Sequence, residues 1–258
     1  MTTEWSGRHT GKEALRQRIW STLAQHGAMV GQGHGHIPDF VGADAAAAQL
    51  AVLPFWESAR VVKSNPDAPQ MPLRLRALQA GKTLYMAVPR LREVKCFVEL
   101  LRDDLQAKGV ALEEAAGVKG ALAHGRPVAF EEMQPIDVVL VGCVAVSRIG
   151  GRTGKGAGFA DLELGILRQF GLVNASTPIA TTVHPLQIVA SDALPMTPTD
   201  SALHWIATPD EVIETHTPFP QPAGIAWDLI QPDQFESIPI LNQLRATRSR
   251  QGSRWETA

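Results

Sequence analysis

The chain is organised around one glycine-rich loop, Gly150-Gly151-Arg152-Thr153-Gly154-Lys155-Gly156-Ala157-Gly158-Phe159-Ala160-Asp161. An apolar run over residues 138–146 precedes the loop, and residues 162–170 follow it with a helix-like composition. Glycines let backbone N–H groups approach an anion closely, and the N-terminus of a helix attracts negative charge. Arg152 and Lys155 can add charge-assisted hydrogen bonds. Strand, glycine loop and helix therefore predict a phosphate-binding loop.

Strand-like and helix-like segments alternate along the chain on both sides of this loop. Helices are predicted over residues 12–25, 44–53, 73–80, 97–106 and 162–170, and strands over 59–63, 83–89, 138–146, 177–189 and 201–208. Such alternation is typical of a mostly parallel sheet with helices on both faces. We therefore expect an α/β fold, a three-layer αβα sandwich of Rossmann-like type. Ligands of such sheets bind beyond the carboxyl ends of strands, where the glycine loop is predicted to lie.

The C-terminal part of the chain has a less regular pattern. Residues 209–213 are expected to form a helical turn, and prolines interrupt any regular pattern from Thr217 onward. The polar residues 245–258 are expected to be a mobile tail. We therefore predict one α/β domain over residues 1–232 and a partly mobile extension over 233–258.

The composition excludes several classes of function. With 45% hydrophobic residues and a net charge of -2, the chain resembles an ordinary globular protein with no basic excess for nucleic acid. No apolar run reaches the ~18–20 residues that a membrane span needs. The N-terminus has neither the basic start nor the apolar core of a signal peptide. The two cysteines, Cys96 and Cys143, form no framework, so a reduced cytoplasmic compartment is expected.

Two familiar phosphate motifs do not fit the loop. A P-loop needs a hydroxyl residue after its lysine, and Lys155 is followed by Gly156. The dinucleotide fingerprint needs Gly-x-Gly-x-x-Gly at a first βα turn, whereas this loop has Gly154-x-Gly156-x-Gly158 late in the chain. Neither a P-loop ATPase nor a dinucleotide-binding protein is predicted.

A third pattern matches. Gly150-x-Arg152-x-Gly154-x-Gly156-x-Gly158-Phe159-x-Asp161 resembles the signature loop of the 5-formyltetrahydrofolate cyclo-ligase family, Gly-x-Arg-Leu-Gly-x-Gly-x-Gly-Tyr-Tyr-Asp. Lys12-Glu13-Ala14-Leu15-Arg16 resembles the Lys-x-x-Leu-Arg helix at the N-terminus of that family. Gln187 and Asp200 also fall where the family has a glutamine and an aspartate. The resemblance extends from about Lys12 to Ile213.

The resemblance implies ATP- and Mg²⁺-dependent ring closure, which converts 5-formyltetrahydrofolate to 5,10-methenyltetrahydrofolate with release of ADP and phosphate. It implies that Arg152 and Lys155 are catalytic and that Asp161 holds Mg²⁺. The phosphates of ATP would be held by the cations, the loop amides and Asp161, which are Lys12, Arg16, Arg152, Gly154, Lys155, Gly156, Gly158 and Asp161. The implied substrate contacts are Phe159 and Asp67. A role in one-carbon metabolism follows from the same resemblance, with no nucleic-acid or membrane partner.

The chain departs from the family pattern on the substrate side of the site. The Tyr-Tyr pair of the family is Phe159-Ala160 here, and the glutamate that contacts the pterin has no counterpart in residues 65–74, where Asp67 is a possible substitute. These departures are typical of a divergent branch that includes the methenyltetrahydrofolate synthetase domain-containing proteins. Three hypotheses stay open: a true cyclo-ligase, an enzyme that uses the same loop on another heterocyclic metabolite such as a thiamine-related one, and a non-catalytic nucleotide-binding protein.

Several other reactive side chains are interpreted as structural. His34 and His36 lie in a loop and form only a weak metal motif, and His184 and His204 are each lone histidines near a strand. Cys143 lies in the most apolar run and is expected in the core.

Overall fold

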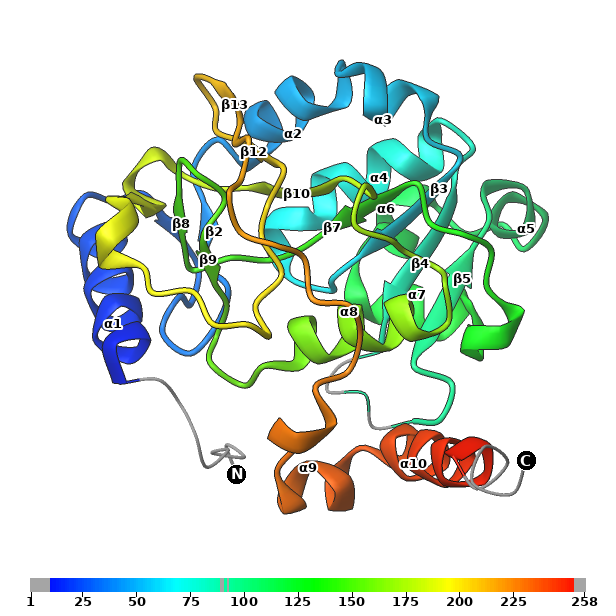
Figure 1. The fold of residues 1–258 in the computed structure, drawn as a ribbon. Helices are drawn as coiled ribbons and strands as arrows, with labels where there is room; N and C mark the ends of the chain where they lie inside the picture. The colour runs from blue at the N-terminus through cyan, green and yellow to red at the C-terminus, as the bar shows by residue number, and fades with distance from the viewer. Residues whose placement is uncertain (1–9, 89–90, 92, 253–258) are drawn as a thin grey trace.

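We analysed a computed structural model, which describes residues 10–88, 91 and 93–252 (Figure 1). Its centre is an eight-stranded sheet with the order β13-β12-β10-β7-β3-β4-β5-β6. The five strands from β12 to β4 pair in parallel, while β13, β5 and β6 pair antiparallel at the two edges. In chain order the strands are β3 (Val61–Ser64), β4 (Thr83–Ala87), β5 (Phe97–Leu100), β6 (Arg126–Val128), β7 (Val138–Leu140), β10 (Ile179–Thr182), β12 (Trp205–Ala207) and β13 (Val212–Glu214). The predicted α/β fold with a mostly parallel sheet is confirmed.

Helices cover both faces of this sheet. One face carries α2 (Ala43–Ala51), α3 (Pro54–Ser58), α4 (Met71–Gln79), α6 (Leu112–Ala116) and α7 (Val118–His124), with α5 (Arg102–Ala107) at its edge, and the other carries α8 (Phe159–Gln169). Successive side chains of β7 point to opposite faces of the sheet, so this strand contributes to the cores on both faces. Val138 and Leu140 pack with the α2 and α4 side, whereas Val139 packs with α8. Each face of β7 is thus apolar and buried, as expected for a central parallel strand.

A smaller unit joins the N-terminal helix to the glycine loop. It is a three-stranded sheet of β11 (Ile188–Val189), β8 (Ala145–Ser147) and β9 (Arg152–Thr153). The helix α1 (Thr10–Gln25) packs its apolar side, with Leu15 and Ile19, on Val144 and Ala145 of this unit. Figure 1 shows α1 beside β8 and β9, and a hairpin of β1 (Met29–Val30) and β2 (Asp39–Phe40) follows it. This packing brings α1 to the glycine loop, more than a hundred residues away in sequence.

The predicted single strand over residues 138–146 is wrong. The chain leaves the central sheet after Leu140 and enters the small sheet at Ala145. The run is apolar throughout because its two halves are buried in different cores, with Val139 in one and Val144 in another. Gly142 lies where the chain passes from one sheet to the other. A Cβ at this position would lie only 2.6 Å from Asp67 Oδ2, so the close approach of Asp67 depends on glycine here.

Three other predicted elements differ. Residues 97–106 were predicted as one helix but form β5 followed by α5, because Phe97 and Leu100 are buried and pair with β4. Residues 209–213, predicted as a helical turn, lead into β13 at the sheet edge. The segment 177–189 is strand only to Thr182, after which a 3₁₀ turn carries the chain into β11.

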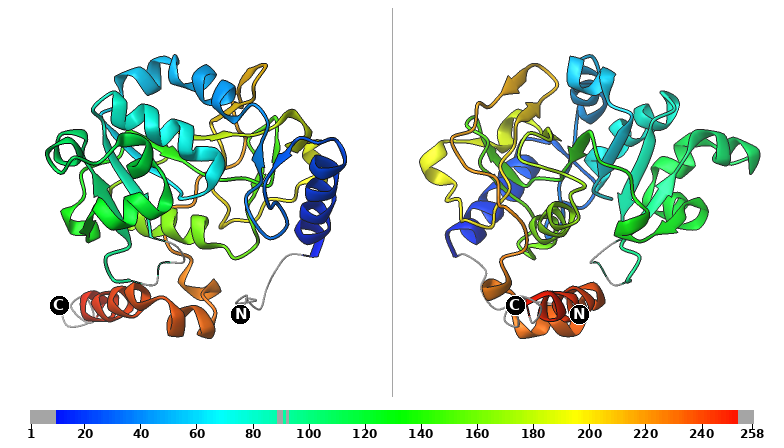
Figure 2. Two further views of the ribbon diagram at one scale, coloured as in Figure 1. Left: turned by 180° about the vertical axis from the view of Figure 1, so that it is seen from behind. Right: turned by 45° about the vertical axis from the view of Figure 1, so that its right-hand side comes forward.

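The C-terminal segment forms two helices, α9 (Pro232–Ser237) and α10 (Pro239–Gly252). They lie together on the α8 side of the molecule (Figures 1 and 2), where Ile238 and Leu241 are fully buried in the same core as α8. Arg245 stacks over the ring of Phe235 at 4.4 Å. The expected tail is therefore helical up to Gly252, its remainder lies outside the described residues, and the division into domain and extension stays a prediction. In the described part of the chain, no helix is long and apolar enough to cross a membrane.

Candidate active site

One pocket of about 840 Å³ contains every site residue predicted from the sequence. Its wall combines α1, the segment that follows β3, and the glycine loop with the start of α8. The predicted residues that line it are Lys12, Arg16, Asp67, Arg152, Gly154, Lys155, Gly156, Gly158, Phe159 and Asp161. Three segments that are distant in sequence therefore meet at one cavity, near the carboxyl end of β3.

The glycine loop adopts backbone conformations that side chains disfavour. Gly156 has φ +102° and Gly158 has φ +67°, both in the left-handed region. Gly158 is the N-cap residue of α8, so the loop ends where the first amides of that helix begin. At Gly156 an added Cβ would lie 2.5 Å from Nη2 of Arg16. The absence of a side chain at Gly156 thus lets the Arg16 guanidinium lie against the loop backbone.

Two of the cations of α1 are buried. Lys12 and Arg16 are four residues apart, and their exposed fractions are 8% and 1%. Lys12 Nζ pairs with Asp200 Oδ2 at 2.5 Å. Arg16 Nη1 lies 3.5 Å from Thr153 Oγ1, and its Nε lies 3.4 Å from Glu13. These contacts hold both cations at the pocket wall, each beside a carboxylate.

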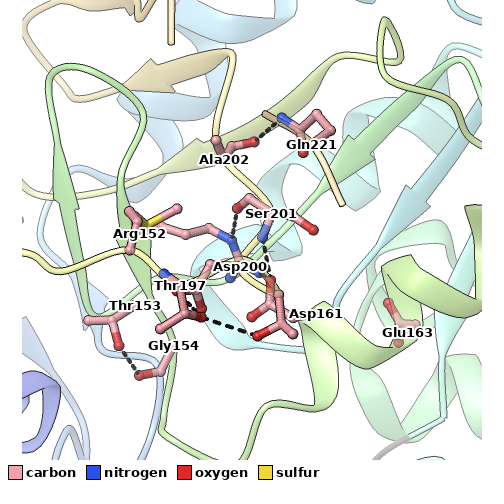
Figure 3. A network of polar contacts seen from close by, with 12 residues as sticks. Arg152, Thr153, Gly154, Asp161, Glu163, Thr197, Asp200, Ser201, Ala202 and Gln221 are labelled. Carbon is pink, nitrogen blue, oxygen red and sulfur yellow. Dashed lines mark hydrogen bonds and ion pairs between the residues drawn. The ribbon is translucent and has the colours of Figure 1, made fainter. Parts of the chain in front are cut away.

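Arg152 and Asp161 form an ion pair inside the site (Figure 3). Arg152 Nε donates a 2.7 Å hydrogen bond to the Ser201 carbonyl, and the Ser201 amide donates to Asp161 Oδ1 at 2.8 Å. Burial lowers the pKa of Arg152, but Asp161, Cys143 and Asp200 together outweigh this effect, so the pKa is raised overall. Arg152 therefore stays charged, and much of its hydrogen-bonding capacity serves to fix Asp161.

The carboxylate of Asp161 fits a magnesium ion that is shared with a phosphate. Arg152 and the Ser201 amide both donate to Oδ1, no described residue donates to Oδ2, and the side chain lines the pocket. Among the described residues there is no cluster of three or more His, Cys, Asp or Glu side chains that could hold a metal. Magnesium commonly binds through one or two carboxylates, with phosphate oxygens and water completing the shell. The donor set suits that kind of site and does not suit an all-protein cage.

Asp67 and Lys155 pair across the pocket at 2.8 Å. Asp67 belongs to a segment held from behind by Arg74, whose guanidinium donates to the Asn65 and Asp67 carbonyls at 2.7 and 3.0 Å. Arg74 is 1% exposed, and burial lowers its pKa to about 10, partly offset by Asp67. Both predicted residues thus lie at the pocket, and each already has an opposite charge as partner.

Sequence reasoning missed a buried ion pair between Lys63 and Glu163. Lys63 is the third residue of β3 and Glu163 lies in the second turn of α8, and their exposed fractions are 0% and 3%. Burial raises the pKa of Glu163, and the Lys63 charge opposes that rise. The available signal was a charge beside apolar neighbours, Lys63 after Val62 and Glu163 between Leu162 and Leu164, but nothing in the sequence indicated that the two charges meet.

His204 has a structural position. Its Nδ1 accepts a 3.0 Å hydrogen bond from the Ile179 amide, and its own amide donates to the Ile179 carbonyl. Burial lowers the pKa of His204, consistent with a neutral ring. Cys143 is also buried, which raises the pKa of its thiol.

Comparison with known proteins identifies the family. The family model for the 5-formyltetrahydrofolate cyclo-ligase family matches residues 8–209. The chain belongs to this family. The match includes α1, the glycine loop and the strands from β3 to β12, which together carry the pocket.

The curated relatives belong to a divergent group within the family. A methenyltetrahydrofolate synthase domain-containing protein from Mus musculus is 35% identical over 243 residues, with coverage of 93% of this chain and 65% of the relative. Its counterpart from Bos taurus is 36% identical over 246 residues, with coverage of 93% and 63%. The chain thus spans slightly less than two thirds of the length of these relatives.

A solved structure supports the fold. The 5,10-methenyltetrahydrofolate synthetase of Aquifex aeolicus aligns with a TM-score of 0.51 at 19% identity, over 80% of this chain and 93% of that protein. At this identity the similarity concerns the fold alone.

Proposed function

We propose that this family member is an ATP- and Mg²⁺-dependent ligase that closes a ring on 5-formyltetrahydrofolate, with ADP and phosphate as further products. One observation carries the proposal: the two buried cations of α1, the glycine loop and Asp161 line a single pocket. The volume of about 840 Å³ is near the upper end of the ~300–1,000 Å³ range of ligand pockets. Such a volume suits a nucleotide and a second ligand side by side.

The reaction needs positioning and charge neutralisation more than covalent catalysis. The formyl oxygen attacks the γ-phosphorus of ATP, and the bond from phosphorus to the ADP oxygen breaks. The neighbouring nitrogen then attacks the formyl carbon and loses its proton, while phosphate leaves with the electron pair of the C–O bond. Enzymes accelerate such phosphoryl transfers by holding donor and acceptor in line and by stabilising the charge on the phosphate oxygens.

The pocket residues fit those tasks. Lys12 and Arg16 are fixed before any ligand arrives, so little reorganisation is needed when they meet phosphate oxygens. The amides around Gly154, Gly156 and Gly158 can add hydrogen bonds at the start of α8. Arg152 and Lys155 would add positive charge, and Asp161 would hold Mg²⁺, which neutralises phosphate charge when bound.

Two alternative functions would use the same phosphate site but differ in the substrate or in catalysis. The Phe159-Ala160 sequence and the engagement of Asp67 by Lys155 leave the substrate end different from the expected pattern. An enzyme for another heterocyclic metabolite, such as a thiamine-related one, would use the same phosphate end. A non-catalytic nucleotide-binding protein would retain only that end. A cytoplasmic location and a role in one-carbon metabolism stay predictions.

The test is a spectroscopic assay with the purified chain. Methenyltetrahydrofolate absorbs in the near ultraviolet, whereas 5-formyltetrahydrofolate does not. We expect an absorbance rise that requires ATP, Mg²⁺ and the enzyme together. No rise, combined with measurable Mg·ATP binding, would refute cyclo-ligase activity and leave the alternative substrates.

A further inference from the structure

The pocket contains a second polar cluster, at the part of its wall that α8 and the end of β3 form. Glu163 and Asn65 both line the pocket, and Lys63 lies behind them. Lys63 Nζ pairs with Glu163 and lies 3.4 Å from Asn65 Oδ1. One buried ammonium therefore holds both a carboxylate and an amide at the pocket wall.

The position of this cluster follows from α8 and the central sheet. Glu163 is four residues after Phe159, so the two share one face of the helix, whereas Asp161 is two residues away. Figure 3 shows Glu163 farther along α8 than the network of Arg152 and Asp161. On the sheet side, Asn65 directly follows β3, and Ala87 at the end of the adjacent β4 also lines the pocket.

Stability alone does not explain a buried pair of this kind. Removing two charges from water costs more than their attraction returns in many proteins, and apolar replacements are often neutral or stabilising. The unmet hydrogen-bonding capacity of the cluster also indicates a ligand. No described residue donates a hydrogen bond to Glu163 Oε2 or accepts one from Asn65 Nδ2, although Glu163 is 3% exposed and Asn65 is 8% exposed.

We propose that Glu163 is the specificity-determining residue for the heterocycle and that Lys63 and Asn65 position it. The carboxylate of Glu163 accepts from the amino and ring N–H groups of a 2-amino-4-oxopyrimidine edge, and Asn65 donates to the adjacent carbonyl. The oxygen that accepts is Oε2, which has two lone pairs for the two neighbouring N–H donors, because Oε1 is buried against Lys63. Phe159, on the same helix face, packs against the ring. This proposal rests on the proposed function and replaces Asp67, which Lys155 occupies, as the principal substrate carboxylate.

The experiment measures ring binding and nucleotide binding separately by calorimetry on the full chain. The ring probe is pterin (2-amino-4-oxopteridine), and lumazine, which has oxygen in place of the amino group, is its matched partner. The variant Lys63→Met/Glu163→Met removes both charges with side chains of similar length, so it avoids a lone buried charge. Lys82→Met is the control, because Lys82 is also a buried lysine but binds the carbonyls of Trp56 and Ala59, away from the pocket.

We expect the double variant to bind pterin at least about tenfold more weakly than the wild type, as loss of a charge-assisted hydrogen bond implies. Mg·ATP affinity should stay within about twofold, lumazine should bind the wild type more weakly than pterin, and Lys82→Met should bind pterin normally. Equal pterin affinity in the wild type and the double variant, or no pterin binding by the wild type, would overturn the proposal. Pterin binding that depends on Glu163 without Mg·ATP binding would instead refute the proposed function and leave this inference standing.

Discussion

Gly156→Ala tests whether the glycine loop and α1 form one phosphate site. The φ of +102° makes any side chain at this position strained, at about 1–2 kcal/mol by analogy with other left-handed residues. In addition, the new Cβ would lie 2.5 Å from Arg16 Nη2, closer than real contacts allow, so the guanidinium must move. If Arg16 binds a phosphate, losing that charge-assisted bond weakens Mg·ATP by about 1.5–3 kcal/mol, or roughly 10–100-fold.

A matched control isolates the displacement of Arg16 from the backbone strain. Gly158 also has a left-handed φ, +67°, but an added Cβ there meets nothing within 4 Å. Gly158→Ala should therefore carry similar strain and leave Arg16 in place. Calorimetric titration with Mg·ATP gives the affinities, and urea unfolding gives the stabilities. An equal affinity loss in both variants, or none in Gly156→Ala, would refute the assignment of Arg16 to the phosphates.

Three further predictions concern stability, each measured by chemical unfolding. Asp161→Asn should destabilise the fold by about 3–5 kcal/mol, because it leaves the buried Arg152 guanidinium without its counter-charge; a loss under 1 kcal/mol would contradict this. Arg74→Met should cost roughly 2–4 kcal/mol because three backbone carbonyls lose their donor, and a stabilising effect would show that burial of the charge dominates. His204 has a lowered pKa, so its stabilising contribution is present above the unfolded pKa of about 6.5 and is lost as pH falls through the folded pKa. The difference in unfolding free energy between wild type and His204→Ala should therefore shrink from pH 7.5 to pH 5, and a constant difference would refute a neutral, hydrogen-bonded ring.

The fold could be predicted where local patterns and topology agree. The helix after the glycine loop has a clear pattern, and the alternation of strands and helices implies a mostly parallel sheet. The prediction of one strand over residues 138–146 was wrong, because the length of a strand cannot be deduced from apolar composition when both halves of the run are buried. Val139 and Val144 have equivalent side chains but enter different cores, which only the tertiary structure distinguishes.

The candidate site could be predicted for residues within a motif and less well for long-range pairs. Lys12 and Arg16 were placed with the loop by family resemblance, and the structure brings them to the same pocket. The pairing of Arg152 with Asp161 was not predicted. The motif assigns Arg152 to a phosphate and Asp161 to Mg²⁺, and nothing in it indicates that the two side chains bind each other. Glu163 was missed because its partner is one hundred residues earlier in the chain, and no local pattern joins them.

The burial of the Arg16 side chain could not be predicted from the sequence either. The four-residue spacing places Arg16 on the same helix face as Lys12, but the spacing does not show whether that face is buried or solvated. The structure shows a guanidinium with 1% exposure between α1 and the loop, a position that depends on Gly156 having no side chain. Only the packed arrangement shows that the two sequence motifs form one wall.

The central claim is that α1 and the glycine loop together bind the phosphates of Mg·ATP. Its most direct test is the affinity of the full chain for Mg·ATP with Arg16→Met, compared with Arg18→Met, which removes an exposed cation two residues away on the same helix. We predict saturable binding by the wild type, a loss of about tenfold or more in Arg16→Met, and little change in Arg18→Met. No saturable binding by the wild type, or equal affinities in the two variants, would contradict the account.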